Sequence, residues 1–211
     1  RRPGALLAAL ALCACGGVEK SLDAANEARH AGRPRDALAG YQAVLAELGE
    51  GKLAAGRAAV RLRALQYAAD VSYLDLGDYQ GAISYYRRVI TLHPGTPEAW
   101  KARAVIGDIY RDRLHDRLAA IAQYAEIAAS ESPDAPAYQL KVAREYLELQ
   151  NWEQSRTEAR ALRERWPRSE LADDAQLLNA QAWALEKRTD EALRAFAALL
   201  DRRPRPEIAA R

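Results

Sequence analysis

One spacing recurs along most of this 211-residue chain: a small residue is followed four positions later by an aromatic one. Four copies are complete, and a fifth lacks the aromatic residue. The five pairs are Ala37/Tyr41, Ala82/Tyr86, Ala120/Tyr124, Ser155/Ala159 and Ala192/Phe196. A proline usually follows twelve residues after the small residue, at Pro94, Pro167 and Pro204, and Pro133 comes one residue late. Residues four apart share one face of a helix, so the pattern predicts repeated helices separated by turns.

The composition agrees with a helical fold. Alanine, leucine and arginine recur, while valine, isoleucine and phenylalanine are scarce, which favours helix over strand. With 49% hydrophobic and 28% charged residues, the chain is neither disordered nor a membrane bundle. The net charge of +2 is accounted for by Arg1 and Arg2. The remaining chain is neutral, so it lacks the basic excess that nucleic-acid binding through phosphate neutralisation requires.

A second spacing precedes the first in four of the repeats: a small residue followed three positions later by an aromatic one. These pairs are Asp70/Tyr73 (imperfect), Gly107/Tyr110, Ala143/Tyr146 and Ala180/Trp183. Together the two spacings resemble the tetratricopeptide repeat (TPR), and the resemblance spans about residues 18–206. It implies an all-α, right-handed superhelical solenoid of about five helix-turn-helix repeats, stabilised by stacking.

We expect the five repeats at 18–51, 63–96, 100–133, 136–169 and 173–206, followed by a tail at 207–211. The first interval is longer than the others, and its extra residues Lys52 to Leu62 are predicted to lengthen the first helix of the second repeat. The tail is too short to form a capping helix. We therefore expect either that a partner covers the face around Phe196 and Leu199, or that the chain is cut short.

The first residues of the chain form a separate segment. Two arginines precede a short apolar run from Ala5 to Ala14, which is too short to span a bilayer and is typical of a secretory signal. The residues Leu12-Cys13-Ala14-Cys15 resemble the bacterial lipobox. The resemblance implies a lipoprotein signal peptide at 1–14, covalent lipidation of Cys15 and a flexible tether at 15–17. Because Gly16 is not aspartate, it also implies an outer-membrane lipoprotein that faces the periplasm.

The residues of the repeats show no catalytic or metal-binding motif. The three histidines, His30, His93 and His115, do not have the spacing of metal ligands, and surface positions explain them. No Gly-rich phosphate loop and no nucleophile elbow is present. We expect no enzymatic activity, no metal, no small-molecule substrate and no cofactor other than the lipid on Cys15. An envelope enzyme or ligand binder remains an alternative of a different class.

The TPR resemblance implies a partner-binding groove on the first helix of each repeat. In TPR families the second, fifth, sixth, ninth and twelfth positions of that helix form the inner face. The candidate groove residues are Tyr67, Val71, Lys101, Asp108, Arg111, Leu140, Lys141, Arg144, Leu147, Leu177 and Gln181. Apolar anchors that alternate with arginines suit an extended or helical segment of a partner protein, and arginine can hold a carboxylate with two hydrogen bonds.

The joints between repeats suggest which envelope machine the chain serves. The segments Trp166–Ala175 and His93–Ala99 look like the aromatic-Pro-x-Ser-x-x-Ala joints of BamD-type lipoproteins, which assemble outer-membrane β-barrel proteins. The resemblance implies a lipid-anchored scaffold whose partners belong to the β-barrel assembly machinery. The alternative is a TPR scaffold or pilotin of another envelope machine, such as a pilus, secretion, division or motility complex.

Overall fold

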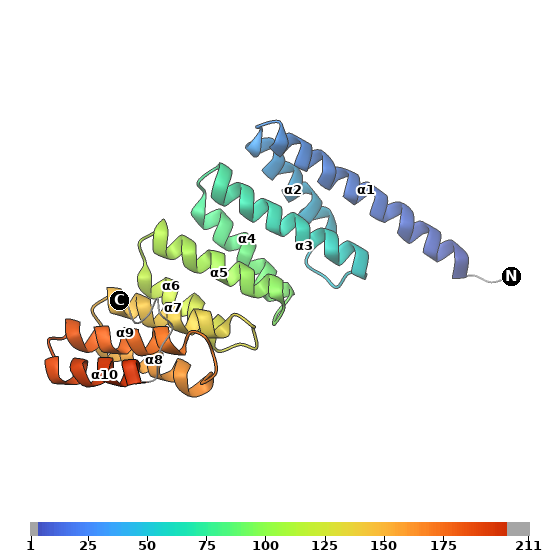
Figure 1. Cartoon of the computed structure of the whole chain (residues 1–211). Helices are drawn as coiled ribbons and strands as arrows, with labels where there is room; N and C mark the ends of the chain where they lie inside the picture. Colours follow the sequence, from blue (N-terminus) through green and yellow to red (C-terminus); the bar gives the residue numbers. More distant parts are fainter. Residues whose placement is uncertain (1–3, 202–211) are drawn as a thin grey trace. The chain divides into compact units, whose positions relative to one another are not determined.

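A computed structural model describes the backbone of residues 4–201 and the side chains of residues 17–201. This part of the chain contains ten α-helices and one π-helical turn and no strand (Figure 1). The expected all-α fold of helix pairs is therefore confirmed, while the right-handed superhelix stays a prediction. The contacts divide the chain into two compact units, Arg1–Ala102 and Arg103–Arg211. The tail at 207–211 and the end of the fifth repeat lie outside the described residues.

The N-terminal unit (Arg1–Ala102) consists of two helix pairs and the beginning of a fifth helix. Its elements are α1 (Gly4–His30), α2 (Pro34–Leu48), α3 (Ala55–Asp70), the π-helical turn η1 (Val71–Asp75), α4 (Tyr79–Leu92) and the first residues of α5 (Pro97–Asp112). Helix α1 packs against α2, and α3 packs against α4. Helix α2 also contacts α3, so the two pairs are stacked within this unit.

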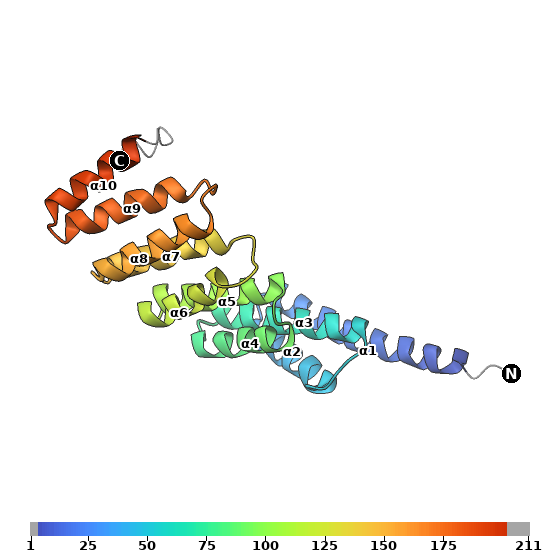
Figure 2. The ribbon, with the colours of Figure 1, turned by 90° about the horizontal axis from the view of Figure 1, so that it is seen from below.

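The C-terminal unit (Arg103–Arg211) continues the same arrangement. It contains the rest of α5, then α6 (Arg117–Ala128), α7 (Ala135–Glu148), α8 (Trp152–Arg165), α9 (Ala172–Leu185) and α10 (Thr189–Asp201). From α6 to α10, each helix packs against the one that follows it, and α7 also contacts α9. Figure 2 shows the pair α9 and α10 beside the pair α7 and α8.

The small residues of the repeat lie where the two helices of a pair meet. All five are buried: Ala37, Ala82, Ala120, Ser155 and Ala192. The closest approach is at Gly107 of α5, where a Cβ atom would lie 2.3 Å from Cε1 of the fully buried Tyr124 of α6. At Gly40 of α2 a Cβ atom would lie 2.7 Å from Cβ of Ala25 in α1. Small residues are therefore required because the backbones come close together.

The turn inside each pair has a common form. In every one of the five turns, a residue with positive φ stands directly before the N-cap of the second helix. These residues are Gly32, Gly77, His115, Gln150 and Lys187. In three turns the next residue is Asp or Asn, and its side chain accepts a hydrogen bond from a backbone N–H of the helix that follows. The left-handed residue ends the first helix and the polar residue begins the second.

The connection between the first two pairs is held by a buried arginine. Arg61 of α3 donates hydrogen bonds from Nη1 to the carbonyl oxygens of Gly49 and Gly51, at 3.0 and 2.8 Å. Its side chain is buried, so it satisfies backbone acceptors that the loop cannot satisfy itself. The expected lengthening of the helix is confirmed from Ala55 onward, whereas residues 52–54 are not helical.

The N-terminal segment is continuous with the first repeat. Helix α1 runs from Gly4 to His30, so residues 15–17, expected as a flexible tether, are helical. The side chains of Cys13 and Cys15 lie outside the described residues. Among the described residues, no helix is both long enough and apolar enough to span a membrane.

A Gly107→Ala substitution tests the close approach of α5 and α6. Alanine favours helix over glycine by about 1 kcal/mol, but the added methyl group would displace the buried ring of Tyr124. We expect a net loss of about 1 to 3 kcal/mol in the free energy of unfolding, measured by urea denaturation. The matched control is Gly56→Ala in α3, where no atom lies within 4 Å of the added methyl group, and it should not destabilise the protein. Equal stability of the two variants would contradict this account of the helix crossing.

Candidate functional site

The first helices of neighbouring repeats are joined by ion pairs. In the C-terminal unit, Lys141 Nζ of α7 lies 2.7 Å from Asp108 Oδ1 of α5, and Arg144 Nη2 of α7 lies 3.7 Å from Asp174 Oδ1 of α9. The surface of α5, α7 and α9 formed by these residues with Arg111 and Glu145 is called the first-helix face below. It is the part of the predicted groove that the structure places within one unit.

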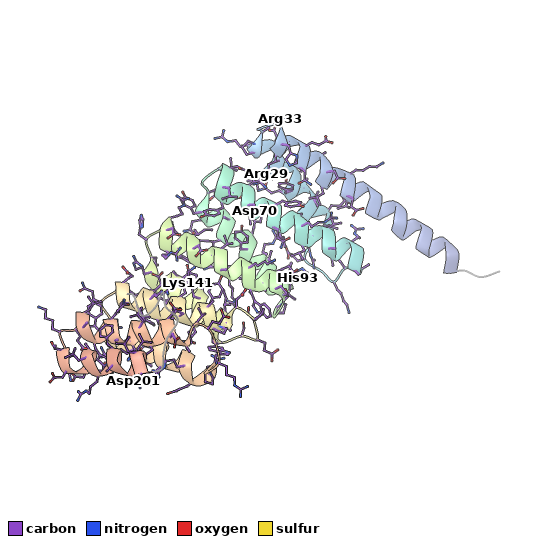
Figure 3. The ribbon with its side chains drawn as sticks, viewed as in Figure 1. Arg29, Arg33, Asp70, His93, Lys141 and Asp201 are labelled. Carbon is purple, nitrogen blue, oxygen red and sulfur yellow. The ribbon has the colours of Figure 1, made fainter. Side chains whose placement is uncertain are left out.

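Asp108 is the centre of this face. Its Oδ1 accepts hydrogen bonds from the Tyr124 hydroxyl and from Lys141 Nζ, each at 2.7 Å. The Lys141 ammonium, labelled in Figure 3, also lies 4.1 Å from the ring centroid of Tyr124 and 5.6 Å from that of Tyr138. Burial, and then the hydrogen bond to Asp108, raise the pKa of Tyr124 well above its usual value. The phenol therefore stays neutral and acts as a donor at physiological pH.

Glu145 of α7 is a buried carboxylate between two arginines. Its side chain is 7% exposed, and its oxygens lie 3.6 Å from Arg111 Nη1 and 2.5 Å from Arg117 Nη1. Arg111 also donates from Nε and Nη2 to the two oxygens of Asp112, at 2.7 and 2.9 Å. This bond raises the pKa of Arg111 and lowers that of Asp112. Without a partner, Arg111 therefore donates two hydrogen bonds to the carboxylate of Asp112, the next residue in the chain.

Arg144 is the most exposed cation of the first-helix face. Its side chain is 54% exposed, whereas that of its ion-pair partner Asp174 is 11% exposed. The same relation holds at Glu145, which is more deeply buried than Arg111 and Arg117. In these pairs the carboxylates are less exposed than the guanidinium groups, whereas Asp108 and Asp112, at 37% and 49%, are more exposed than their partners Lys141 and Arg111.

Three predicted groove residues are buried in the structure and offer almost no surface to a partner, so their contact with one stays a prediction. Val71, Leu140 and Leu177 have exposed fractions of 0%, 4% and 5%. Leu140 belongs to a core cluster with Leu162 and other residues of α8 and α9, because a fixed position on the first helix can face the neighbouring helices as well as the groove. Leu177 packs with Leu199 of α10.

The other predicted residues are at least partly accessible. Asp108, Arg111, Lys141 and Arg144 lie together on the first-helix face. The remaining ones are Leu147, half-buried against the cluster of Leu140, Gln181, half-buried on α9, and, in the N-terminal unit, the half-buried Tyr67 and the exposed Lys101.

The pairing of the buried tyrosines was missed by the sequence analysis, although the sequence contains a signal for it. The hydroxyls of the three repeat tyrosines each donate to a polar residue of the first helix in the same pair. The bonds are Tyr41 to Asn26 at 2.7 Å, Tyr86 to Asp70 at 2.5 Å and Tyr124 to Asp108 at 2.7 Å. Each acceptor directly follows a buried small residue. In the two repeats without a tyrosine the same position carries Arg144 and Gln181, neither of which is a carboxylate.

The same comparison corrects the register of the second repeat. The position that corresponds to Asp108 is Asp70, one residue before the predicted Val71. The shift arises where α3 passes into the π-helical turn η1, which accommodates an additional residue before the turn. Figure 3 labels Asp70 together with Arg29, whose Nε lies 2.8 Å from Asp75 Oδ2.

The charged groups of the first-helix face suit binding by charge and shape. Within the described residues, no group of three or more His, Cys, Asp or Glu side chains is placed to hold a metal ion. The charged groups of the first-helix face interact with one another, and its tyrosine is held neutral. Such a surface can recognise a partner through hydrogen bonds and ion pairs.

A Tyr124→Phe substitution measures the contribution of the hydroxyl at Asp108. The variant loses a hydrogen bond to a carboxylate, so we expect about 1.5 kcal/mol less free energy of unfolding. Tyr146→Phe is the control, because Tyr146 packs against the core cluster that contains Tyr124, and its hydroxyl makes no hydrogen bond to the described residues. Chemical denaturation of both variants checks the expectation, which fails if they lose the same amount.

Comparison with known proteins supports the repeat assignment. The chain is similar to the crystal structure of MamA, with 16% sequence identity, a TM-score of 0.56 and coverage of 87% of this chain and 90% of that one. It is also similar to YrrB, described as a TPR protein with an unusual peptide-binding site, with 13% identity, a TM-score of 0.51 and coverage of 90% and 88%. At these identities the likeness shows the fold alone. No curated protein matches the sequence significantly.

Two family models, both described as tetratricopeptide repeat, match residues 62–106 and 140–206. Together they match more than half of the chain. Among the described residues, the first match runs from within α3 to within α5, and the second runs from within α7 to the end of α10. With ten helices arranged in pairs over residues 4–201, the chain belongs to the tetratricopeptide-repeat family.

Proposed function

We propose that this TPR chain is a lipid-anchored scaffold that holds an acidic segment of a partner protein on the first-helix face. The observation that carries the proposal is the arrangement of charge on α5, α7 and α9. At Asp174 and Glu145 the carboxylates are less exposed than their partners Arg144 and Arg111, and than Arg117 of the neighbouring α6, so a partner that approaches these pairs meets guanidinium groups. The similar structure of YrrB is described as a TPR protein with an unusual peptide-binding site, which supports a binding role.

Arginine is suited to this role. Its planar group presents several donors at once and can hold a carboxylate with two hydrogen bonds. Arg144 lies 3.7 Å from Asp174, which is longer than a hydrogen bond. Its guanidinium group can therefore donate hydrogen bonds to a carboxylate of the partner. The partner segment contributes Asp or Glu side chains, or a chain terminus. The proposal assigns no catalytic residue.

The lipid anchor is proposed from the sequence alone. Cleavage before Cys15 and acylation of this residue would bind the chain to a membrane through its N-terminus without a membrane-spanning helix. Gly16, in place of aspartate, favours the outer membrane, with the repeats facing the periplasm. The covalent lipid is the one non-protein group that the proposal requires.

The joints favour outer-membrane β-barrel assembly as the process in which the scaffold acts. Trp166–Ala175 connects α8 to α9 and His93–Ala99 leads into α5, so both BamD-like segments lie at joints between repeats. The partners are then proteins of the β-barrel assembly machinery. A scaffold of another envelope machine would share the fold and the anchor but not these partners.

An Arg144→Ala substitution tests the binding face. We expect the amount of partner that is crosslinked to the chain in intact envelopes and identified by mass spectrometry to fall at least tenfold, as for a central arginine of an interface. Arg160→Ala is the matched control, because Arg160 is an exposed arginine of α8 in the same helix pair and lies on a second helix. Equal recovery from both variants would remove the first-helix face from the proposal. Recovery of pilus, secretion or division proteins instead would replace β-barrel assembly as the process.

A Cys15→Ser substitution tests the anchor separately. The variant should remain uncleaved and should not incorporate radioactive palmitate, because serine lacks the thiol that is acylated. Cys13→Ser is the control and should be labelled normally, since this residue leaves with the signal peptide. Normal labelling of the Cys15→Ser variant would contradict the lipid anchor and leave the binding proposal intact.

A further inference from the structure

Helix α10 has two apolar sides. Ala192, Ala195 and Leu199 are buried against the preceding helix, whereas Leu193 and Leu200 are 64% and 57% exposed. We expected Leu199 to lie on the open face, but it is 2% exposed and packs with Leu177. The correction moves the open face to the other side of the helix.

The exposed side is a regular stripe. Leu193, Phe196, Ala197 and Leu200 follow the spacing i, i+3, i+4, i+7, which is the pattern of a helix that packs against another helix. Phe196, at the edge of the stripe, is half-buried against the cluster of Leu177 and Leu199, whereas Ala197 is exposed. A stripe of this kind on one exposed helix indicates a contact that is made with another helix.

The earlier second helices of the same unit show what such a stripe does. Ile121 of α6 directly follows the small residue of its repeat, as Leu193 does in α10, and it is buried in a cluster with Val142 of α7. Arg156, at this position in α8, is buried beneath Trp183 of α9, with its guanidinium 3.6 Å from the ring centroid. In both cases the first helix of the next repeat covers the position. On α10 this position is Leu193, and no helix among residues 4–201 covers it.

The charges beside the stripe are self-complementary. Arg194 and Asp201 are both exposed, have opposite charges and are seven residues apart, the same separation as Leu193 and Leu200 (Figure 3 labels Asp201). If two such helices run in opposite directions with Ala197 at the centre, Leu193 and Leu200 of the two copies lie within about 1.5 Å along the axis of direct opposition, and so do Arg194 and Asp201. Leucine then meets leucine and each charge meets the opposite charge, which is what a contact between two identical surfaces requires.

We propose that α10 of one copy of the chain packs antiparallel against α10 of a second copy, to form a two-fold symmetric dimer. Leu193 of each copy faces Leu200 of the other, and Arg194 faces Asp201. Ala197 lies close to the two-fold axis, where its small side chain lets the helices approach. This contact is independent of the first-helix face and of the proposed partner.

A head-to-tail arrangement fits less well. In that case α10 of one copy would be covered by the free side of α1 in another. The exposed residues of α1 include Glu19, Lys20, Asp23 and Glu27, which are charged. An apolar stripe would then face a charged surface, at the cost of desolvating those charges. The symmetric pair of α10 helices avoids this cost.

The dimer is expected to be weak and reversible. One pair of short helices buries less than the roughly 1,200 Å² typical of stable complexes. We expect a dissociation constant on the order of micromolar, so that the balance of monomer and dimer depends on concentration.

Cysteine crosslinking tests the geometry of this pair. In the full chain with Cys13 and Cys15 replaced by serine, Ala197→Cys should form a disulfide-linked dimer on mild oxidation. Ala198→Cys is the matched control: it is also exposed, but it lies about 100° further round the helix and should crosslink much less. The N-terminal segment is present in both variants, so any association through it affects both equally. Equal crosslinking of the two variants would overturn the proposal.

An exchange of the charges at Arg194 and Asp201 tests whether a second copy of the chain covers α10. In sedimentation equilibrium of the same full chain, Arg194→Asp should weaken the dimer about tenfold, because two acidic groups then face each other at both ends. The double variant Arg194→Asp/Asp201→Arg should regain the original affinity, which only a contact between two copies predicts. A chain that is monomeric at all concentrations, or a double variant no tighter than Arg194→Asp, would overturn the proposal.

Discussion

The close approach of two helix backbones at small residues is the constraint on which the rest of the structure depends. At Gly107 the space that a side chain would take is occupied by the ring of Tyr124. With the ring fixed there, its hydroxyl reaches Asp108, and Asp108 in turn holds Lys141 of the next repeat. One contact inside a helix pair thus determines how a charged residue of the neighbouring pair is placed. Packing and surface charge are therefore coupled in this fold, and a change at a helix crossing also alters the face available to a partner.

Much of the fold is predictable from the sequence, because its main determinants are local. The spacing of small and aromatic residues indicates the crossings, and prolines and polar residues indicate the joints. The candidate site is less predictable, since a position on a helix specifies a direction but not the neighbour found there. Leu140 and Leu177 satisfy the groove spacing and are nevertheless buried by helices from other repeats. The one-residue shift at Asp70 comes from the π-helical turn, which no local propensity indicates. The ion pairs of Glu145 join residues 28 or more positions apart along the chain and depend on the stacking itself.

The ion pairs of the first-helix face have a double consequence for binding. Pairs that are open to solvent contribute little to stability, because water screens them and ordering the side chains costs entropy. A partner carboxylate can therefore replace Asp112 at Arg111 without unfolding the repeat. The buried Glu145 differs: removing its arginines would leave an uncompensated charge inside the protein. The face thus combines ion pairs built on the buried Glu145 and Asp174 with more open pairs at Asp108 and Asp112, and the open pairs are the ones that can exchange partners.

The hydrogen bonds of Arg61 bear on how a repeat array can change in length. The connections between pairs differ in length, from four residues at 93–96 to six at 49–54, and in the latter the carbonyl groups of Gly49 and Gly51 are satisfied by a side chain from the helix that follows. An insertion at a joint is thus compatible with the stack when the adjoining helix provides a donor long enough to reach it. Joints, in contrast to helix crossings, are consequently the places where such a chain can acquire new residues, and with them new surface, while the register of every later helix is kept.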